Sequence, residues 1–152
     1  MPSVVGTSRL DDVTALILAT IRALPELEGV SVFDGPPVGD DSPKRLVLIG
    51  DDGDPESEVE STFEHTWANF SQTRKRETGE IPCAAIAWDG GSDVAPTRET
   101  AFLLMSVCEL AILALVDDDL SISIVSGKNQ PVQNSRGAAT VVPFLIRYST
   151  TL

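Results

Sequence analysis

The apolar positions of residues 10–24 recur every three or four places, which is the spacing of one face of an α-helix. Ser8 precedes this stretch as a candidate cap, and two aspartates follow where the helix dipole favours negative charge. Pro25 ends the pattern because proline cannot continue a helix. The sequence therefore predicts an amphipathic helix over residues 10–24, after an unanchored arm of residues 1–7.

A second helical pattern occurs later in the chain. Asp93 or Thr97 can cap it, and Pro96 lies in or just before its first turn. Its predicted apolar face consists of Ala101, Leu104, Met105, Cys108, Ile112 and Leu115. Three aspartates, Asp117 to Asp119, follow. Because carboxylates are unfavourable at a helix C-terminus, we expect a solvated turn there.

Between and after the two helices, several stretches have the composition or the alternation of β-strands. They are residues 30–33, 45–49, 59–70, 81–88, 122–125 and 138–150. Residues 45–49 are almost wholly apolar, which predicts a central strand buried on both faces. Phe63, His65 and Trp67 alternate with polar residues and are expected to share one face of their strand.

The connections between these strands indicate how the strands pair. A polar segment, residues 71–79, joins two strands that we expect to form a long antiparallel hairpin able to project from the body. Residues 126–131 are expected to be a loop. In the last strand, Pro143 removes a ladder donor, which predicts an edge strand or a bulge. A run of strands between two helices predicts an α+β fold, with a mostly antiparallel sheet and both helices packed on one face.

Composition and charge narrow the classes of function. The chain has 152 residues and no linker that divides it, so we expect one domain over residues 1–152. A net charge of −12 argues against tight binding to nucleic acid, which needs clustered Lys and Arg, although DNA can pass nearby without sticking. No apolar run approaches the roughly 20 residues that cross a bilayer. Cys83 and Cys108 are too few for a disulfide framework and are expected to be buried, reduced thiols.

No residue pattern identifies an active site. His65 is the only histidine, so two histidines cannot hold a metal, and a structural or surface role is favoured. A dyad of His65 with Cys83 is disfavoured, because no helix N-terminus lies near Cys83 to lower its pKa. The acidic loop, residues 50–58, resembles a set of calcium ligands, but Gly53 comes too early and Pro55 interrupts it. We expect a solvated loop, no metal site, no cofactor and no catalytic residue.

Charge and aromatic content give a set of interface candidates. The one basic cluster, Arg74 to Arg76, can contact DNA or pair with the acidic loop of a neighbouring copy, and on so acidic a chain the second is favoured of these two. A plain solvated turn remains an equal alternative. Trp67 and Trp88 are expected in the core, with an interface anchor as the alternative for either. The candidate interface residues are Arg74, Lys75, Arg76, Asp51, Asp52, Asp54, Glu56 and Trp67.

The order and spacing of these parts resemble the tail terminator family of long-tailed bacteriophages, especially those of actinobacterial hosts. The resemblance covers residues 10–150, and no single motif within it is diagnostic. The segments that carry it are LDDVTALILATIRALPEL, GVSVFDGPPVGDD, RLVLIGDDG, GEIPCAAIAWDGGSDVAPTRETAFLLMSVCELAILAL and GAATVVPFLIRYSTTL.

The resemblance implies a structural virion protein rather than an enzyme. Tail terminators form a ring, typically a hexamer, on the head-proximal end of the tail tube, stop its polymerisation and join the neck of the head. The implied partners are further copies, the major tail tube protein and a head–tail connector or stopper protein, with DNA passing through the channel and assembly in the bacterial cytoplasm. The alternatives are a head–tail stopper, a tail tube subunit, a small enzyme or ligand-binding domain that uses His65 and the acidic loop, and a host-derived binding module.

Overall fold

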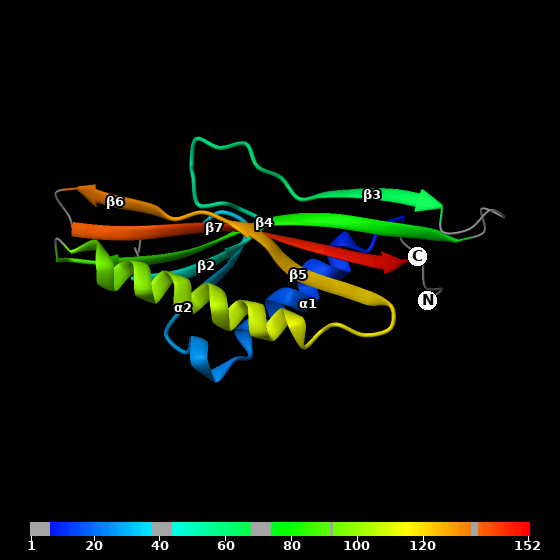
Figure 1. Cartoon of the computed structure of the whole chain (residues 1–152), viewed down its shortest axis with the longest axis horizontal. Helices are drawn as coiled ribbons and strands as arrows, with labels where there is room; N and C mark the ends of the chain where they lie inside the picture. Colours follow the sequence, from blue (N-terminus) through cyan, green and yellow to red (C-terminus); the bar gives the residue numbers. More distant parts are fainter. Residues whose placement is uncertain (1–6, 38–43, 68–73, 92, 135–136) are drawn as a thin grey trace.

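The computed structural model describes residues 7–37, 44–67, 74–91, 93–134 and 137–152 (Figure 1). Most of the expected arm, residues 1–7, lies outside these ranges. The elements are α1 (Leu10–Arg22), η1 (Pro25–Leu27), β1 (Ser31–Asp34), β2 (Arg45–Ile49), β3 (Thr62–Trp67), β4 (Lys75–Asp89), α2 (Val94–Leu113), β5 (Leu120–Gly127), β6 (Gln130–Asn134) and β7 (Gly137–Thr151).

Two long strands, β4 and β7, form the centre of the sheet and pair antiparallel from Arg76↔Thr151 to Asp89↔Ala138. The other edge of β4 pairs first with β3 and, further along the strand, with β2. The other edge of β7 pairs first with β6 and then with β5. Only β1 and β2 pair in parallel among the described strands. The expected α+β fold with a mostly antiparallel sheet is confirmed.

Side-chain hydrogen bonds form at the start of both helices, although the N-cap of α1 is Arg9 and not the predicted Ser8. The Ser8 hydroxyl accepts a hydrogen bond from the Leu10 amide (3.0 Å), and the Asp93 carboxylate accepts one from the Ala95 amide (3.1 Å). Of the two predicted caps of α2, Asp93 is therefore the one used. Thr97 is buried instead and shares a hydrogen bond of 2.8 Å with Thr140 of β7.

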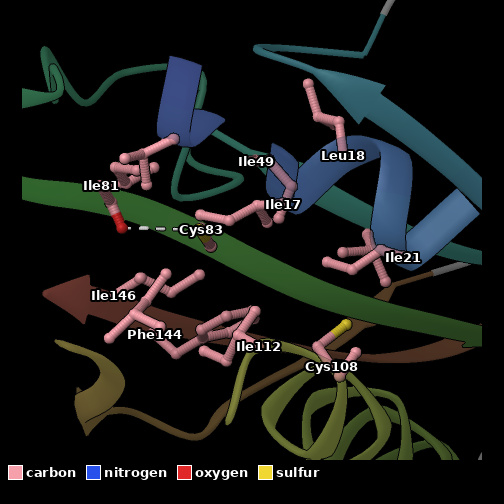
Figure 2. Close-up of a cluster of buried hydrophobic side chains, with 14 of the residues drawn as sticks. Ile17, Leu18, Ile21, Ile49, Ile81, Cys83, Cys108, Ile112, Phe144 and Ile146 are labelled. Carbon is pink, nitrogen blue, oxygen red and sulfur yellow. Dashed lines mark hydrogen bonds between the residues drawn. The ribbon is translucent and has the colours of Figure 1, made fainter. Parts of the chain in front are cut away.

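The main hydrophobic core lies between the sheet and the two helices, which pack on the same face as predicted (Figure 2). Ile17 and Ile21 of α1 and Ile112 of α2 pack against alternate residues of β2, β4 and β7. Cys83 and Cys108 are free and buried in this core, as the sequence predicts. Burial raises the pKa of Cys108 to about 12 and that of Cys83 further, so both remain protonated thiols at neutral pH.

A smaller core lies on the opposite face of the sheet, around Leu48, Ala84 and Ile86. The acidic loop passes directly over it. Gly53 has φ +80°, and a Cβ at this position would lie 3.2 Å from Ile86 and 3.4 Å from the side chain of Ala84. Because only glycine combines this backbone conformation with so close an approach, Gly53 allows the loop to cover the sheet.

Several strand boundaries differ from the sequence predictions. The strand predicted at residues 81–88 begins at Lys75, so much of the expected connection, residues 71–79, is part of β4. The loop predicted at residues 126–131 is short, because β5 continues to Gly127 and β6 follows. The predicted hairpin of β3 and β4 is confirmed, and it extends the sheet because β7 accompanies β4 as far as Arg76.

The prediction from Pro143 of an edge strand is wrong, because β7 is an interior strand. The Pro143 carbonyl accepts a hydrogen bond from Lys128 (2.9 Å), at the junction where β5 ends and β6 begins. In a strand the amide and the carbonyl of one residue point to the same side. The N–H group that Pro143 lacks would therefore point into the gap between the ladder with β5 and the ladder with β6. The bulge expected at Pro143 occurs instead in β5, between Ile124 and Ser126. Neither described helix is long and apolar enough to cross a membrane.

Candidate interaction surfaces

The hairpin of β3 and β4 exposes two aromatic rings. Phe63 and Trp67 share one face of β3 with His65, as predicted, but Trp67 is 51% exposed and Phe63 is 44% exposed. The core position expected for Trp67 is therefore wrong: among the described residues β3 pairs with β4 alone, and none of them buries the Trp67 ring. Lys75, opposite Trp67 on β4, places its ammonium group 5.2 Å from the ring centroid. Trp88, by contrast, is half-buried against the smaller core.

The basic cluster lies at the end of the hairpin where β3 connects to β4. Arg74 precedes β4 and is exposed, while Lys75 and Arg76 are the first two residues of the strand. Lys75 lies on the same face as Trp67, and Arg76 is exposed on the opposite face. Within the described residues none of the three cations forms an ion pair. They are available to carboxylates of another molecule.

The acidic loop is held together by its own carboxylates. Asp51 accepts a hydrogen bond from the Gly53 amide (3.1 Å), Asp52 from Asp54 (3.0 Å), and Asp54 from Glu56 (2.9 Å). Asp51 and Asp52 are half-buried on the sheet, so the expectation of a solvated loop holds for Asp54, Glu56 and Glu58 but not for the first part of the loop. Among the described residues no group of three or more His, Cys, Asp or Glu side chains is arranged to hold a metal ion.

The two oppositely charged candidates do not meet within one chain. The acidic loop lies over Ala84 and Ile86 of β4, whereas the basic cluster is at the start of that strand. Nine residues separate Lys75 from Ala84, which corresponds to about 30 Å along a strand. Figure 1 shows the loop that leads into β3 above the middle of the sheet and the end of the hairpin at the right. Any pairing between them requires a second copy.

A buried polar network, which the sequence does not predict, joins the hairpin to the body. The Glu77 side chain is fully buried and accepts hydrogen bonds from the Tyr148 hydroxyl (2.7 Å) and the Arg9 amide (3.0 Å), and it pairs with His65 Nε2 at 2.8 Å. Burial alone would raise the pKa of Glu77, but hydrogen bonds from Tyr148, Ser8, His65 and the Arg9 backbone together lower it. Glu77 is thus a buried carboxylate that stays ionised and connects β3, β7 and the start of α1.

Neighbouring contacts reinforce this junction. The Arg9 guanidinium donates to Thr150 of β7 (2.7 Å) and pairs with Asp119 (3.1 Å), which precedes β5. Gly79 lies opposite Tyr148, and any side chain there would collide with the tyrosine ring. The ring therefore occupies the space above the glycine, and this close packing orients the Tyr148 hydroxyl toward Glu77.

The disfavoured dyad of His65 and Cys83 does not form. His65 lies opposite Glu77 and pairs with it, whereas Cys83 lies six residues further along β4, opposite Ile49 and Phe144. The Cys83 thiol donates to the Ile81 carbonyl (3.4 Å) within the core (Figure 2). The hydrogen bond to Glu77 gives His65 a structural contact between β3 and β4, in line with the role that the sequence analysis favours.

An apolar groove between α1 and α2 is a further surface that sequence reasoning missed. It has a volume of about 300 Å³ and is lined by Thr20, Leu24, Glu26, Val107, Leu110, Ala111 and Ala114. Leu110, on its rim, is 72% exposed. The signal in the sequence was that α2 is apolar on nearly all sides, whereas the sheet of its own chain covers only one of them.

Comparison with protein-family models and with curated proteins finds no match. A solved structure is similar, however: a chain described as "Virion of native gene transfer agent (GTA) particle" superposes with a TM-score of 0.61 at 16% sequence identity. The superposition covers 91% of this chain and 94% of that chain. At this identity the likeness concerns the fold, which extends over nearly the whole length of both chains.

Proposed function

We propose that this chain is a structural virion protein that caps the head-proximal end of a phage-type tail tube, as a tail terminator. In this role it closes into a ring, which is typically a hexamer in that family. The ring stops tube polymerisation and offers a surface to the neck of the head. It acts without a catalytic residue, metal or cofactor. Its partners are its own copies, the tail tube protein and a head–tail connector or stopper protein.

The observation that carries this proposal is the likeness of the fold to a chain from a virion particle over almost the entire length of both proteins. Fold by itself does not define function, so the proposal also draws on the family resemblance of residues 10–150 and on the molecule's surfaces. Those surfaces are unpaired charges and exposed apolar groups, which suit an assembly protein.

The distribution of charge supports a closed, head-to-tail assembly. Arg74, Lys75 and Arg76 are separated from the acidic loop within one chain, so complementary contacts between them require different copies. Contacts between different patches propagate around a ring when the rotation closes. Arg74 and Arg76, with Asp51, Asp52, Asp54 and Glu56, are accordingly proposed to contribute to the edges of the ring.

The proposal is tested by removing the protein from tail assembly. With the gene deleted from its phage or prophage, we expect overlong tails without heads, visible by negative-stain electron microscopy. Supplying the chain from a plasmid should restore tails of uniform length. Virions with heads and normal tails after deletion would contradict the proposal.

Electron microscopy of the purified protein separates the two nearest alternatives. A terminator should give single rings or unassembled protein, even at high concentration. Long tubes would instead identify a tube subunit. A head–tail stopper would be distinguished by the deletion phenotype, because tails of normal length would accumulate apart from heads filled with DNA.

A further inference from the structure

The exposed aromatic face of the hairpin and the groove between α1 and α2 match in chemistry. We infer that Trp67 of one copy, with Lys75 beside it, inserts into the α1–α2 groove of a second copy. This inference rests on the proposed function, since it supplies the contact between neighbouring copies of the ring. It deepens that proposal by naming the two surfaces that meet.

The hairpin has the properties of an inserting element. Trp67 and Phe63 expose 51% and 44% of their surfaces, and both lie on the same face of β3. Large aromatic side chains contribute most strongly to interfaces when they are buried against a partner. The network of Glu77, His65 and Tyr148 fixes the strands that carry these rings, so little conformational entropy is lost when a partner covers them.

The groove has the properties of a receptor for such an element. Its lining is apolar apart from Thr20 and Glu26, and its volume of about 300 Å³ is at the lower end for clefts that bind ligands. A space of this size suits one large side chain rather than a cofactor. The exposure of Leu110 on its rim leaves apolar surface that nothing within the described part of the chain covers.

Charge complementarity selects a second copy as the occupant. Lys75 lies over the Trp67 ring, so the inserting face carries positive charge. Glu26 lines the groove, Glu109 lies beside Leu110 on α2, and neither forms an ion pair within the described residues. The acidic loop offers Lys75 carboxylates but no apolar recess for Trp67. The groove offers both.

The two surfaces belong to different parts of the molecule. Figure 1 shows β3 along the upper edge of the sheet, with α1 and α2 below it. A contact between them is therefore heterologous, and each copy can donate its hairpin to one neighbour and accept that of another. This is the geometry that a ring requires.

Cross-linking between introduced cysteines tests the contact on the purified full-length chain. One preparation carries Thr66→Cys, an exposed position next to Trp67 that leaves the inserting ring in place, and a second carries Leu110→Cys. The two are mixed with a short thiol–thiol cross-linker, which also captures transient contacts. The native Cys83 and Cys108 are buried and should not react. We expect a covalent dimer from the mixture only, and none from either preparation alone.

Matched controls make the result specific. Leu103→Cys places a thiol on the same helix, about two turns from Leu110 and similarly exposed, and should give little product with Thr66→Cys. Adding Lys75→Glu to the Thr66→Cys chain should slow cross-linking about two- to fivefold, because a partly exposed ion pair is lost. Adding Glu26→Lys to the Leu110→Cys chain should then restore the rate.

Three outcomes would overturn the inference. They are no dimer at any protein concentration, equal yield with Leu103→Cys, and a dimer from Thr66→Cys alone. The gene deletion reports independently. If the deletion gives overlong tails but no 66–110 product forms, the terminator function stands and this contact is wrong. If the product forms but deletion leaves tails normal, the contact stands without that function.

Discussion

The two ends of the central strand pair differ sharply although β4 and β7 run through both. At one end, residues 81–87 of β4 are apolar and buried, with helices on one face and the acidic loop on the other. At the other end, residues 75–80 include two cations, the buried carboxylate of Glu77 and further polar residues. Here β3 replaces β2 as the strand that pairs with β4. We call these the body end and the hairpin end.

The difference between the two ends separates stability from recognition. The body end buries apolar surface on both sides of the sheet, which is the main favourable contribution to folding. The hairpin end leaves Phe63 and Trp67 uncovered and is held to the body by hydrogen bonds of Glu77. Exposed groups on a fixed scaffold are typical of binding surfaces. Substitutions at the two ends should therefore have distinct consequences.

The largest effect on stability is expected from Ile146→Ala at the body end. Ile146 is fully buried between the sheet and the helices, and truncation of such a side chain costs about 2–5 kcal/mol of the free energy of unfolding. Trp67→Ala at the hairpin end should cost no more than about 1 kcal/mol. Urea unfolding under conditions that keep the protein dissociated measures both. Equal losses would remove the distinction between the two ends.

A smaller, pH-dependent effect is expected from Glu77→Gln. The folded-state pKa of Glu77 is lowered, so its ionised form contributes stability above its unfolded pKa of about 4.3, and that contribution is lost as pH falls through the folded value. At neutral pH the substitution should cost roughly 1–3 kcal/mol, because the donors Tyr148 and Arg9 lose a charged acceptor.

The pH profile distinguishes this carboxylate from others. From neutral pH down to about 3, the wild-type chain should lose stability more steeply than Glu77→Gln, so that the two unfolding free energies converge. Glu80→Gln, three residues away on the more exposed face, is the matched control and should leave the acid slope almost unchanged. Parallel wild-type and Glu77→Gln profiles would show that Glu77 does not hold the hairpin end by its charge.

The body end was the more predictable of the two from sequence. Residues 45–49 and 138–150 are continuous apolar or alternating runs, and the structure has β2 and β7 there. The start of β4 was missed because its inward positions hold Glu77 and Gly79, which do not look like a buried strand face. A carboxylate can be buried there because Tyr148, His65 and the Arg9 amide form hydrogen bonds with it in the folded chain.

The interaction surfaces were predictable in part. Local charge identified the basic cluster and the acidic loop, but not that Gly53 brings the loop onto the sheet. The alternation of Phe63, His65 and Trp67 correctly predicted a shared face, but periodicity does not indicate what covers that face, and the core position expected for Trp67 is wrong. The groove depends on how α1 and α2 cross, and that follows from the whole core rather than from either helix.

The smallest effect is expected from the open polar face of the hairpin end. Arg147 pairs with Glu80 across β7 and β4 at 3.1 Å, and both side chains are well exposed. Solvent screens such a pair, so Arg147→Ala should lower the free energy of unfolding by less than about 1 kcal/mol, with the difference shrinking as salt increases. A double-mutant cycle with Glu80→Gln measures the coupling directly. A coupling well above that limit, persisting in high salt, would mean that this face holds the hairpin end together as much as the buried Glu77 does.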